Sequence, residues 1–124
     1  MPSRAEALEA VKVGDVIFGL GASGQEKLLL VERADANGFA ARHVTTQMTF
    51  RFGRDGRTRA YADGGHVTIV STALLPSEMS EVALGLDRKF AARPEYPDSV
   101  LSKDEVQLLL ICKAFFMAHP LPQG

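Results

Sequence analysis

Three glycine-containing turn signals divide the middle of this chain into short runs of strand-forming residues. They are Asn37-Gly38, Asp55-Gly56 and Asp63-Gly64-Gly65. Asn-Gly and Asp-Gly favour tight hairpins because glycine, and less readily Asn and Asp, accepts a positive φ. Turns that recur at intervals of about ten residues are typical of a small all-β meander or barrel. We therefore expect residues 13–71 to form a small barrel or a bent antiparallel sheet.

The hairpin around the second turn signal has a register that decides where its arginines lie. The alternation of residues 47–52 places the phenylalanines on one face of the strand. With a three-residue loop, Phe52 pairs with Thr58, and Arg51 lies opposite Arg59 on the other face. A two-residue loop puts Arg59 beside Phe52, because a slip of one residue moves every side chain to the opposite face. We predict the three-residue loop, which keeps Arg59 out of the core.

Helices are expected on both sides of the β part. Ser3 to Glu6 and Ser102 to Glu105 both have the spacing of a capping box, which predicts a short N-terminal helix and a long C-terminal one. Ser77 is expected to cap a third helix, whose apolar residues recur every three or four positions. The chain has 124 residues, enough for one domain with a modest core. We predict a single α+β domain, mainly β, in which a helical part at 77–118 packs on the β part at 13–71.

A GxGxxG pattern follows the first expected strand and consists of Gly19, Gly21 and Gly24. In a dinucleotide-binding fold this pattern opens a helix whose N-terminus holds the pyrophosphate. The β-branched Val31 and the meander that follows favour a strand at residues 25–34, which makes the pattern a glycine-rich hairpin. The alternative is a small nucleotide-dependent enzyme. A strand or a helix at residues 25–34 separates these two interpretations.

Other chemistry is not indicated by the pattern of residues. His43, His66 and His119 are far apart and have no carboxylate or cysteine at the spacing of a zinc site, so we expect no metal and no cofactor. Cys112 lies in the most apolar segment and is expected to be a buried, inert thiol. No run reaches the roughly 18 apolar residues of a membrane span, and no signal peptide is evident. A single cysteine fits a reducing compartment, and we expect a cytoplasmic protein.

Charge is distributed unevenly along the chain. Residues 27–59 carry seven basic and three acidic side chains, a net charge of +4, whereas residues 78–105 carry four basic and seven acidic ones, a net charge of −3. One interpretation is that the arginines are solvated or pair with the acidic helices. The other is a strand face that binds anions or nucleic acid, with Tyr61 as a stacking platform. The members of this predicted basic face are Arg42, Arg51, Arg54, Arg57, Arg59 and Tyr61.

The β part resembles a small SH3-like barrel of the kind found in bacterial proteins without an assigned function. The resemblance rests on residues 13–17, 28–32 and 49–52 and on the turns at Asn37-Gly38 and Asp55-Gly56. It implies a fold whose members mostly bind peptides or nucleic acids. The helical part lies outside this resemblance.

The segment 103–118 is apolar nearly all round, since Gln107 and Lys113 are its only polar residues after position 105. Such a helix is buried on more than one side. The barrel and the preceding helix cover it in one interpretation. In the other, an uncovered apolar part forms a homodimer interface, because monomers rarely keep a large apolar patch and two-fold dimers are common. The predicted interface residues are Leu109, Ile111, Phe115 and Phe116. We expect a non-enzymatic binding or assembly module.

Overall fold

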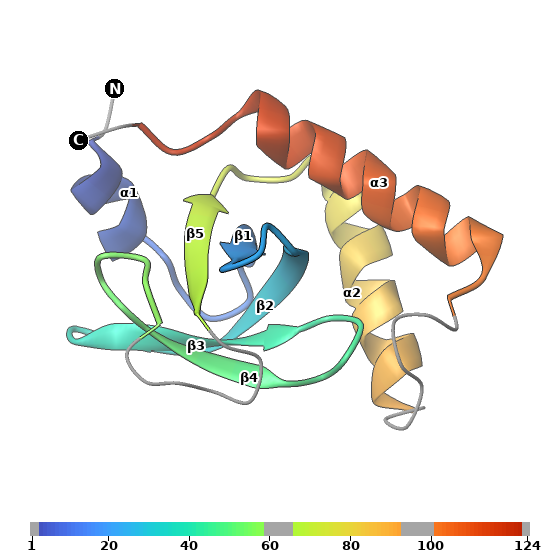
Figure 1. Cartoon of the computed structure of the whole chain (residues 1–124), viewed down its shortest axis with the longest axis horizontal. Helices are drawn as coiled ribbons and strands as arrows, with labels where there is room; N and C mark the ends of the chain where they lie inside the picture. Colours follow the sequence, from blue (N-terminus) through green and yellow to red (C-terminus); the bar gives the residue numbers. More distant parts are fainter. Residues whose placement is uncertain (1–2, 59–65, 93–100, 123–124) are drawn as a thin grey trace.

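The structure, a computed structural model, describes residues 3–58, 66–92 and 101–122. These residues form an α+β fold organised around one antiparallel sheet, as the sequence predicts (Figure 1). The elements in chain order are α1 (Arg4–Glu9), β1 (Val16–Gly21), β2 (Glu26–Asp35), β3 (Gly38–His43), β4 (Thr49–Gly53), β5 (Val67–Ser71), α2 (Ser77–Ala91) and α3 (Lys103–Ala118).

The sheet has the strand order β4-β3-β2-β1-β5 and curls into half of a barrel. Residues 56–58 connect its two ends, because Thr58 pairs with Phe52 of β4 and Arg57 pairs with Thr68 of β5. The pairing of Phe52 with Thr58 is the one that the three-residue loop predicts. Arg59 lies outside the described residues, so its predicted position opposite Arg51 stays a prediction.

Two of the three turn signals lie in the described residues, and each needs its glycine for a different reason. Gly56 has a φ of 79°, which is the positive value expected in such a turn. At Gly38 the φ is not positive, but a Cβ atom there would collide with the backbone carbonyl oxygen of Phe52. The Asp35 carboxylate completes this turn by accepting the N–H groups of Asn37 and Gly38 at 2.8 and 3.0 Å. The third signal, at residues 63–65, lies outside the described residues.

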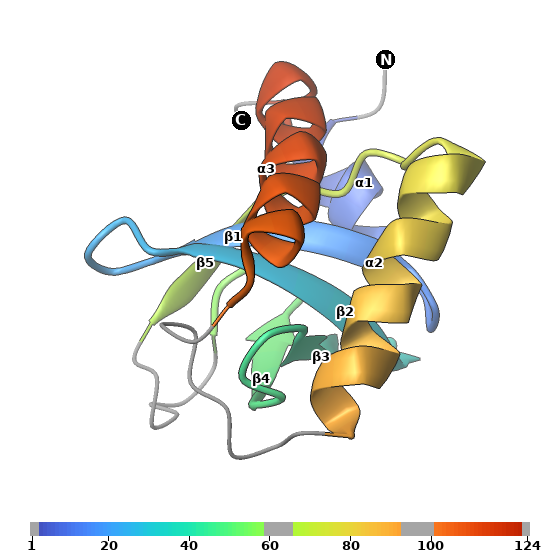
Figure 2. The ribbon, with the colours of Figure 1, turned by 90° about the vertical axis from the view of Figure 1, so that its right-hand side faces the viewer.

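The sheet has an apolar core on each of its faces. The inner core lies within the curl and is closed by α1, whose Leu8 is almost fully buried there. The second core lies between β1, β2 and the two long helices, which cover the same side of the sheet (Figure 2). Its buried aromatic members are Phe18 of β1, Phe90 of α2 and Phe116 of α3, and the rings of Phe18 and Phe116 stack with centroids 5.7 Å apart.

The helix ends agree with the sequence in two cases and differ in one. Both predicted capping boxes form, at Ser3 with Glu6 and at Ser102 with Glu105. The prediction for α2 is wrong at its cap. Pro76 occupies the N-cap position, and no side chain hydrogen-bonds to the first turn. Proline fixes the φ of the cap residue instead, and Ser77 becomes the first residue of the helix.

Candidate functional site

One face of α3 presents large apolar side chains to solvent. Val106, Leu110, Ile111 and Met117 are each 40–48% exposed. They are four of the six exposed large hydrophobic residues in the described part of the chain. Three of them follow the helical repeat at positions 106, 110 and 117, and the small, exposed residue 114 lies among them. We call Val106, Leu110, Ile111 and Met117 the outer face of α3.

The opposite side of α3 belongs to the core of the same chain. Phe116 and Cys112 are fully buried, and Leu109 and Phe115 are half-buried against the same core. Of the four residues predicted for a dimer interface, only Ile111 therefore lies on the outer face. Gln107 is exposed within the outer face, one turn before Leu110 and Ile111, and Lys113 is half-buried at its margin. These two polar positions are the sequence signal that could have identified its side of the helix.

Arg42 of the predicted basic face is bound by acidic residues of its own chain. Its Nε and Nη2 atoms donate to the two carboxylate oxygens of Asp87 in α2, at 3.0 and 2.8 Å. Its Nη1 atom donates to Glu32 of β2 at 2.8 Å. This two-bond fork fastens α2 to β3, as in the interpretation in which the arginines pair with the acidic helices. The charge of Arg42 is therefore already matched.

The environment of this pair holds both groups in their charged forms. Burial alone raises the pKa of Asp87, but hydrogen bonds from Arg42 and Gln47, with the charges of Arg42 and Arg88, outweigh burial, so its pKa lies below the ordinary value. The hydrogen bond to Asp87 raises the pKa of Arg42. Gln47 contributes from the β3–β4 connection and has a φ of 65°, which is unusual for a residue other than glycine. The unusual backbone conformation of Gln47 thus accompanies a hydrogen bond that stabilises the Arg42–Asp87 ion pair.

Arg54 also has a structural role. Its Nη1 atom donates to the carbonyl oxygens of Leu8 and Val11, at 2.9 and 3.1 Å, just where α1 ends. Its Nε atom donates to the carbonyl oxygen of Asp35 at 2.9 Å. The last carbonyls of a helix have no partner within the helix, so this arginine satisfies them and holds α1 across the end of the curled sheet.

The remaining members of the predicted basic face are not brought together by internal contacts. Arg51 and Arg57 are exposed, and their side chains make no ion pair or hydrogen bond with any described residue. Arg59 and Tyr61 lie outside the described residues. A stacking platform beside the arginines therefore stays a prediction.

The glycine-rich segment is a hairpin between two antiparallel strands. β2 begins at Glu26, so a strand rather than a helix follows the GxGxxG pattern. Gly24 has a φ of 83° in the turn. At Gly19 a Cβ atom would come within 3.0 Å of the carbonyl oxygen of Thr68 in β5, so this glycine permits close strand contact. The helix that a pyrophosphate site requires is not formed at Gly19, Gly21 and Gly24.

The described residues contain neither a metal-binding cluster nor an exposed thiol. No group of three or more histidine, cysteine or carboxylate side chains there is placed to hold a metal ion. Cys112 is free and buried, and burial raises the pKa of its thiol, which keeps it protonated and unreactive. In the same described ranges no helix is both long enough and apolar enough to cross a membrane.

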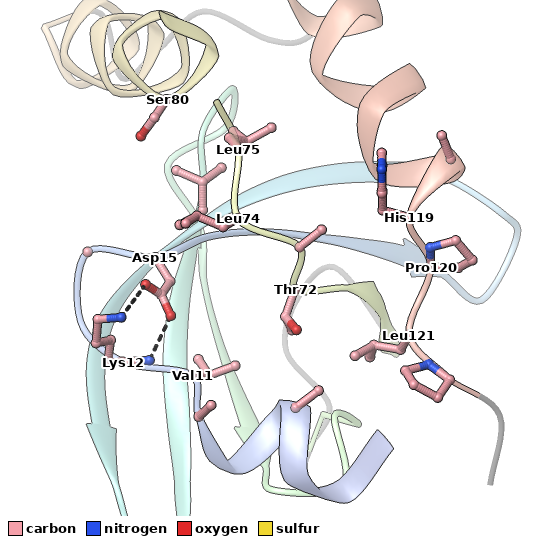
Figure 3. A pocket seen from close by; sticks show the side chains of 17 residues that line it. Val11, Lys12, Asp15, Thr72, Leu74, Leu75, Ser80, His119, Pro120 and Leu121 are labelled. Carbon is pink, nitrogen blue, oxygen red and sulfur yellow. Dashed lines mark hydrogen bonds and ion pairs between the residues drawn. The ribbon is translucent and has the colours of Figure 1, made fainter. Parts of the chain in front are cut away.

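A pocket of about 730 Å³ lies between α1, the connection from β5 to α2 and the segment that follows α3 (Figure 3). Its lining is mostly apolar, and Leu74 at its edge is 87% exposed. Its charged pair, Lys12 with Asp15 at 3.6 Å, lies across the pocket from His119. The Nδ1 atom of His119 is hydrogen-bonded to the Phe115 carbonyl oxygen at 2.9 Å. These polar groups do not converge on one point, so the pocket lacks the geometry of a catalytic site.

Comparison of the chain with models of protein families, with curated proteins and with solved structures finds no match in any of the three.

Proposed function

We propose that this protein is a non-enzymatic assembly module that forms a homodimer through the outer face of α3. The observation that supports this proposal is the concentration of exposed large apolar side chains on one face of one helix. Among the described residues 40–48% of each of these side chains is open to water, and a second copy offers a surface of the same kind. A two-fold axis lets one patch meet itself, which is the simplest way to cover it.

An antiparallel arrangement of the two α3 helices fits the residues best. With the two-fold axis near the middle of the helix, Val106 approaches Met117 of the partner subunit, and Leu110 approaches Ala114 of the partner subunit. The small side chain at position 114 leaves a recess for the leucine. Antiparallel helices also place opposite ends of their dipoles side by side. The apolar residues thereby cover one another without bringing like charges together at the centre.

The exposed areas predict a weak dimer. Complete burial of one such side chain contributes about 1.5–3 kcal/mol, and 40–48% of each is still exposed. Eight side chains, four from each copy, then contribute about 5–11 kcal/mol. Association costs about 4–15 kcal/mol in lost translational and rotational freedom. At best the gain of about 11 kcal/mol exceeds the cost of about 4 kcal/mol by about 7 kcal/mol, so we expect a monomer–dimer equilibrium with a dissociation constant between about 10 µM and about 1 mM.

Sedimentation equilibrium over a concentration series tests the proposal. The average mass is expected to rise from the monomer value of 13.4 kDa toward twice that value. Leu110→Glu places a charge at the centre of the interface and should hold the protein at the monomer mass. Leu74→Glu is the matched control, because Leu74 is the most exposed large apolar residue in the described part of the chain and lies outside α3. A mass that stays at the monomer value up to about 1 mM contradicts the proposal.

Two further expectations belong to this proposal. We place the protein in the cytoplasm, which is supported by a single free, buried thiol at Cys112 that suits a reducing compartment. We also propose that the β part is an SH3-like barrel, which is supported by its five-stranded curled sheet and by the bridges of residues 56–58.

A further inference from the structure

Two arginines lie on either side of an alanine in one row across three strands. Arg33 of β2 pairs with Ala40 of β3, and Ala40 pairs in turn with Arg51 of β4. The adjacent row contains Phe39 and Phe52, whose side chains belong to the inner core. Since side chains alternate between faces, Arg33, Ala40 and Arg51 point to the outer face of the sheet. Neighbouring strands are about 4.8 Å apart, so the two arginine backbones are separated by about 10 Å.

A hollow of about 340 Å³ occupies this part of the outer face. Arg33 and Arg51 line it, together with Glu32, Asp35 and the β-strand residues around Ala40. Alanine has the smallest side chain that a strand commonly carries, so the centre of the row is low and its two ends are tall. Ala40 at the floor of the hollow is 8% exposed, and an arginine lies on each side of it.

Glu32 beside the hollow is paired with Arg42 and Asp35 accepts two backbone N–H groups, whereas no described residue pairs with the two arginines. Glu32 accepts hydrogen bonds from Arg42 and from Thr49, both at 2.8 Å. Asp35 accepts the backbone N–H groups of its own turn. The side chains of Arg33 and Arg51 are exposed and make no ion pair or hydrogen bond with the described residues. Two neighbouring positive charges repel each other, and an anion between them relieves that repulsion.

We propose that the hollow over Ala40 binds a phosphate group, held by Arg33 and Arg51 together. A guanidinium group forms two parallel hydrogen bonds to a phosphate, and the tetrahedral oxygens of one phosphate offer a pair to each of two arginines. The smaller carboxylate has only two oxygens and satisfies one fork. The phosphate belongs to a small phosphate ester, whose terminal group keeps three free oxygens and meets both forks by sharing one, or to the backbone of a single-stranded nucleic acid, whose phosphodiester keeps two and gives one to each arginine. This site is separate from the outer face of α3, so it does not depend on dimer formation.

The test is an NMR titration that follows the side-chain Nε–Hε signals of the arginines. Inorganic phosphate should shift the signals of Arg33 and Arg51 to saturation, beyond any shift from sodium chloride at equal ionic strength. Arg33→Ala and Arg51→Ala should each weaken phosphate binding by about tenfold or more, because a charge-assisted pair of hydrogen bonds is lost. Arg57→Ala is the matched control, since Arg57 is exposed but does not line the hollow.

A second variant tests whether phosphate binding needs the space over Ala40 as well as the two arginine charges. Ala40→Leu keeps both arginines and fills the space between them, so it should weaken phosphate binding as much as the loss of one arginine. Urea unfolding of this variant checks that the sheet is intact. Equal phosphate binding by Ala40→Leu and the original protein overturns the proposal. So does the absence of a saturable shift, an equal loss in Arg57→Ala, or tighter binding of acetate than of phosphate.

The source of the phosphate is decided by a third comparison, between inorganic phosphate and a single-stranded oligothymidylate. Tighter binding of the oligonucleotide, with a logarithmic salt slope of about −0.7 for the one phosphate that the site holds, supports a nucleic-acid ligand. Equal affinity for the two probes supports a small phosphate ester. Both results require loss of binding in Arg33→Ala and Arg51→Ala, and binding that survives both substitutions refutes the site.

Discussion

Replacement of Arg42 by alanine should destabilise the fold more than replacement of any exposed arginine. The carboxylate of Asp87 has a side-chain exposure of 8%, and Arg42 supplies two of its hydrogen bonds. Removing one partner of a buried pair costs about 3–5 kcal/mol, because the other charge stays buried. Gln47 still donates to Asp87, and the Arg42 side chain is itself 27% exposed, so we expect a smaller loss of about 2–4 kcal/mol. For a chain of this length that lowers Tm by about 8–16 °C.

The same pair predicts how the loss depends on pH. The pKa of Asp87 is lowered in the folded protein, so the pair stabilises the fold above the ordinary carboxyl pKa of 3.8, and this contribution disappears as the pH falls through the lowered value. The free energies of unfolding of Arg42→Ala and the original protein, measured in urea from pH 7 to the acid range, should therefore converge below about pH 4. Arg57→Ala is the control, and we expect it to change stability by less than about 0.5 kcal/mol. An Arg42→Ala variant as stable as this control at pH 7 refutes the structural role of the pair.

Three further predictions concern single positions. Arg54→Ala should destabilise the fold by about 1–3 kcal/mol and speed hydrogen exchange in α1, because the carbonyls at the end of that helix lose the Arg54 guanidinium as a donor. Unchanged exchange in α1 would show that Arg54 does not hold this helix in place. Gly38→Ala should destabilise the fold, measured by urea unfolding, more than Gly24→Ala, which costs about 1 kcal/mol through its positive φ alone. Cys112 should react with a thiol reagent only after denaturation, and fast labelling of the native protein contradicts its burial.

The local features of the fold could be read from the sequence because each depends on residues close together. Capping boxes need two residues three positions apart, and both form as predicted. The pairing of Phe52 with Thr58 follows from loop length and alternation. The reason for Gly38 was harder to predict, since it arises from the approach of β4 rather than from the turn itself. At α2 the N-cap is Pro76, which has no side-chain donor or acceptor. The serine that usually marks an N-cap, here Ser77, therefore predicts the cap one residue too late.

The candidate sites depend on contacts between distant residues, which a single sequence does not specify. One interpretation of the charge pattern was that arginines are solvated or pair with the acidic helices, but the pattern did not specify that Asp87, 45 residues away, pairs with Arg42. A helix that is apolar nearly all round has only Gln107 and Lys113 to indicate which side meets the core, so the predicted interface included the buried Phe116 and missed the exposed Leu110. The row of Arg33 and Arg51 depends on the irregular register between β2 and β3, where the pairing shifts between Val31 and Arg33. With an undistorted register, Arg33 would not pair with Ala40 and would not lie in the same row as Arg51.

The most direct test of self-association is a dilution series of two-dimensional NMR spectra of the labelled protein, from about 1 mM to about 10 µM. Backbone and methyl signals of Val106, Leu110, Ile111 and Met117 should shift with concentration and fit one monomer–dimer equilibrium. Signals of the sheet face around Ala40 should stay constant in the same series. Spectra that are identical at all concentrations, or shifts confined to residues away from α3, would contradict a dimer built on the outer face of this helix.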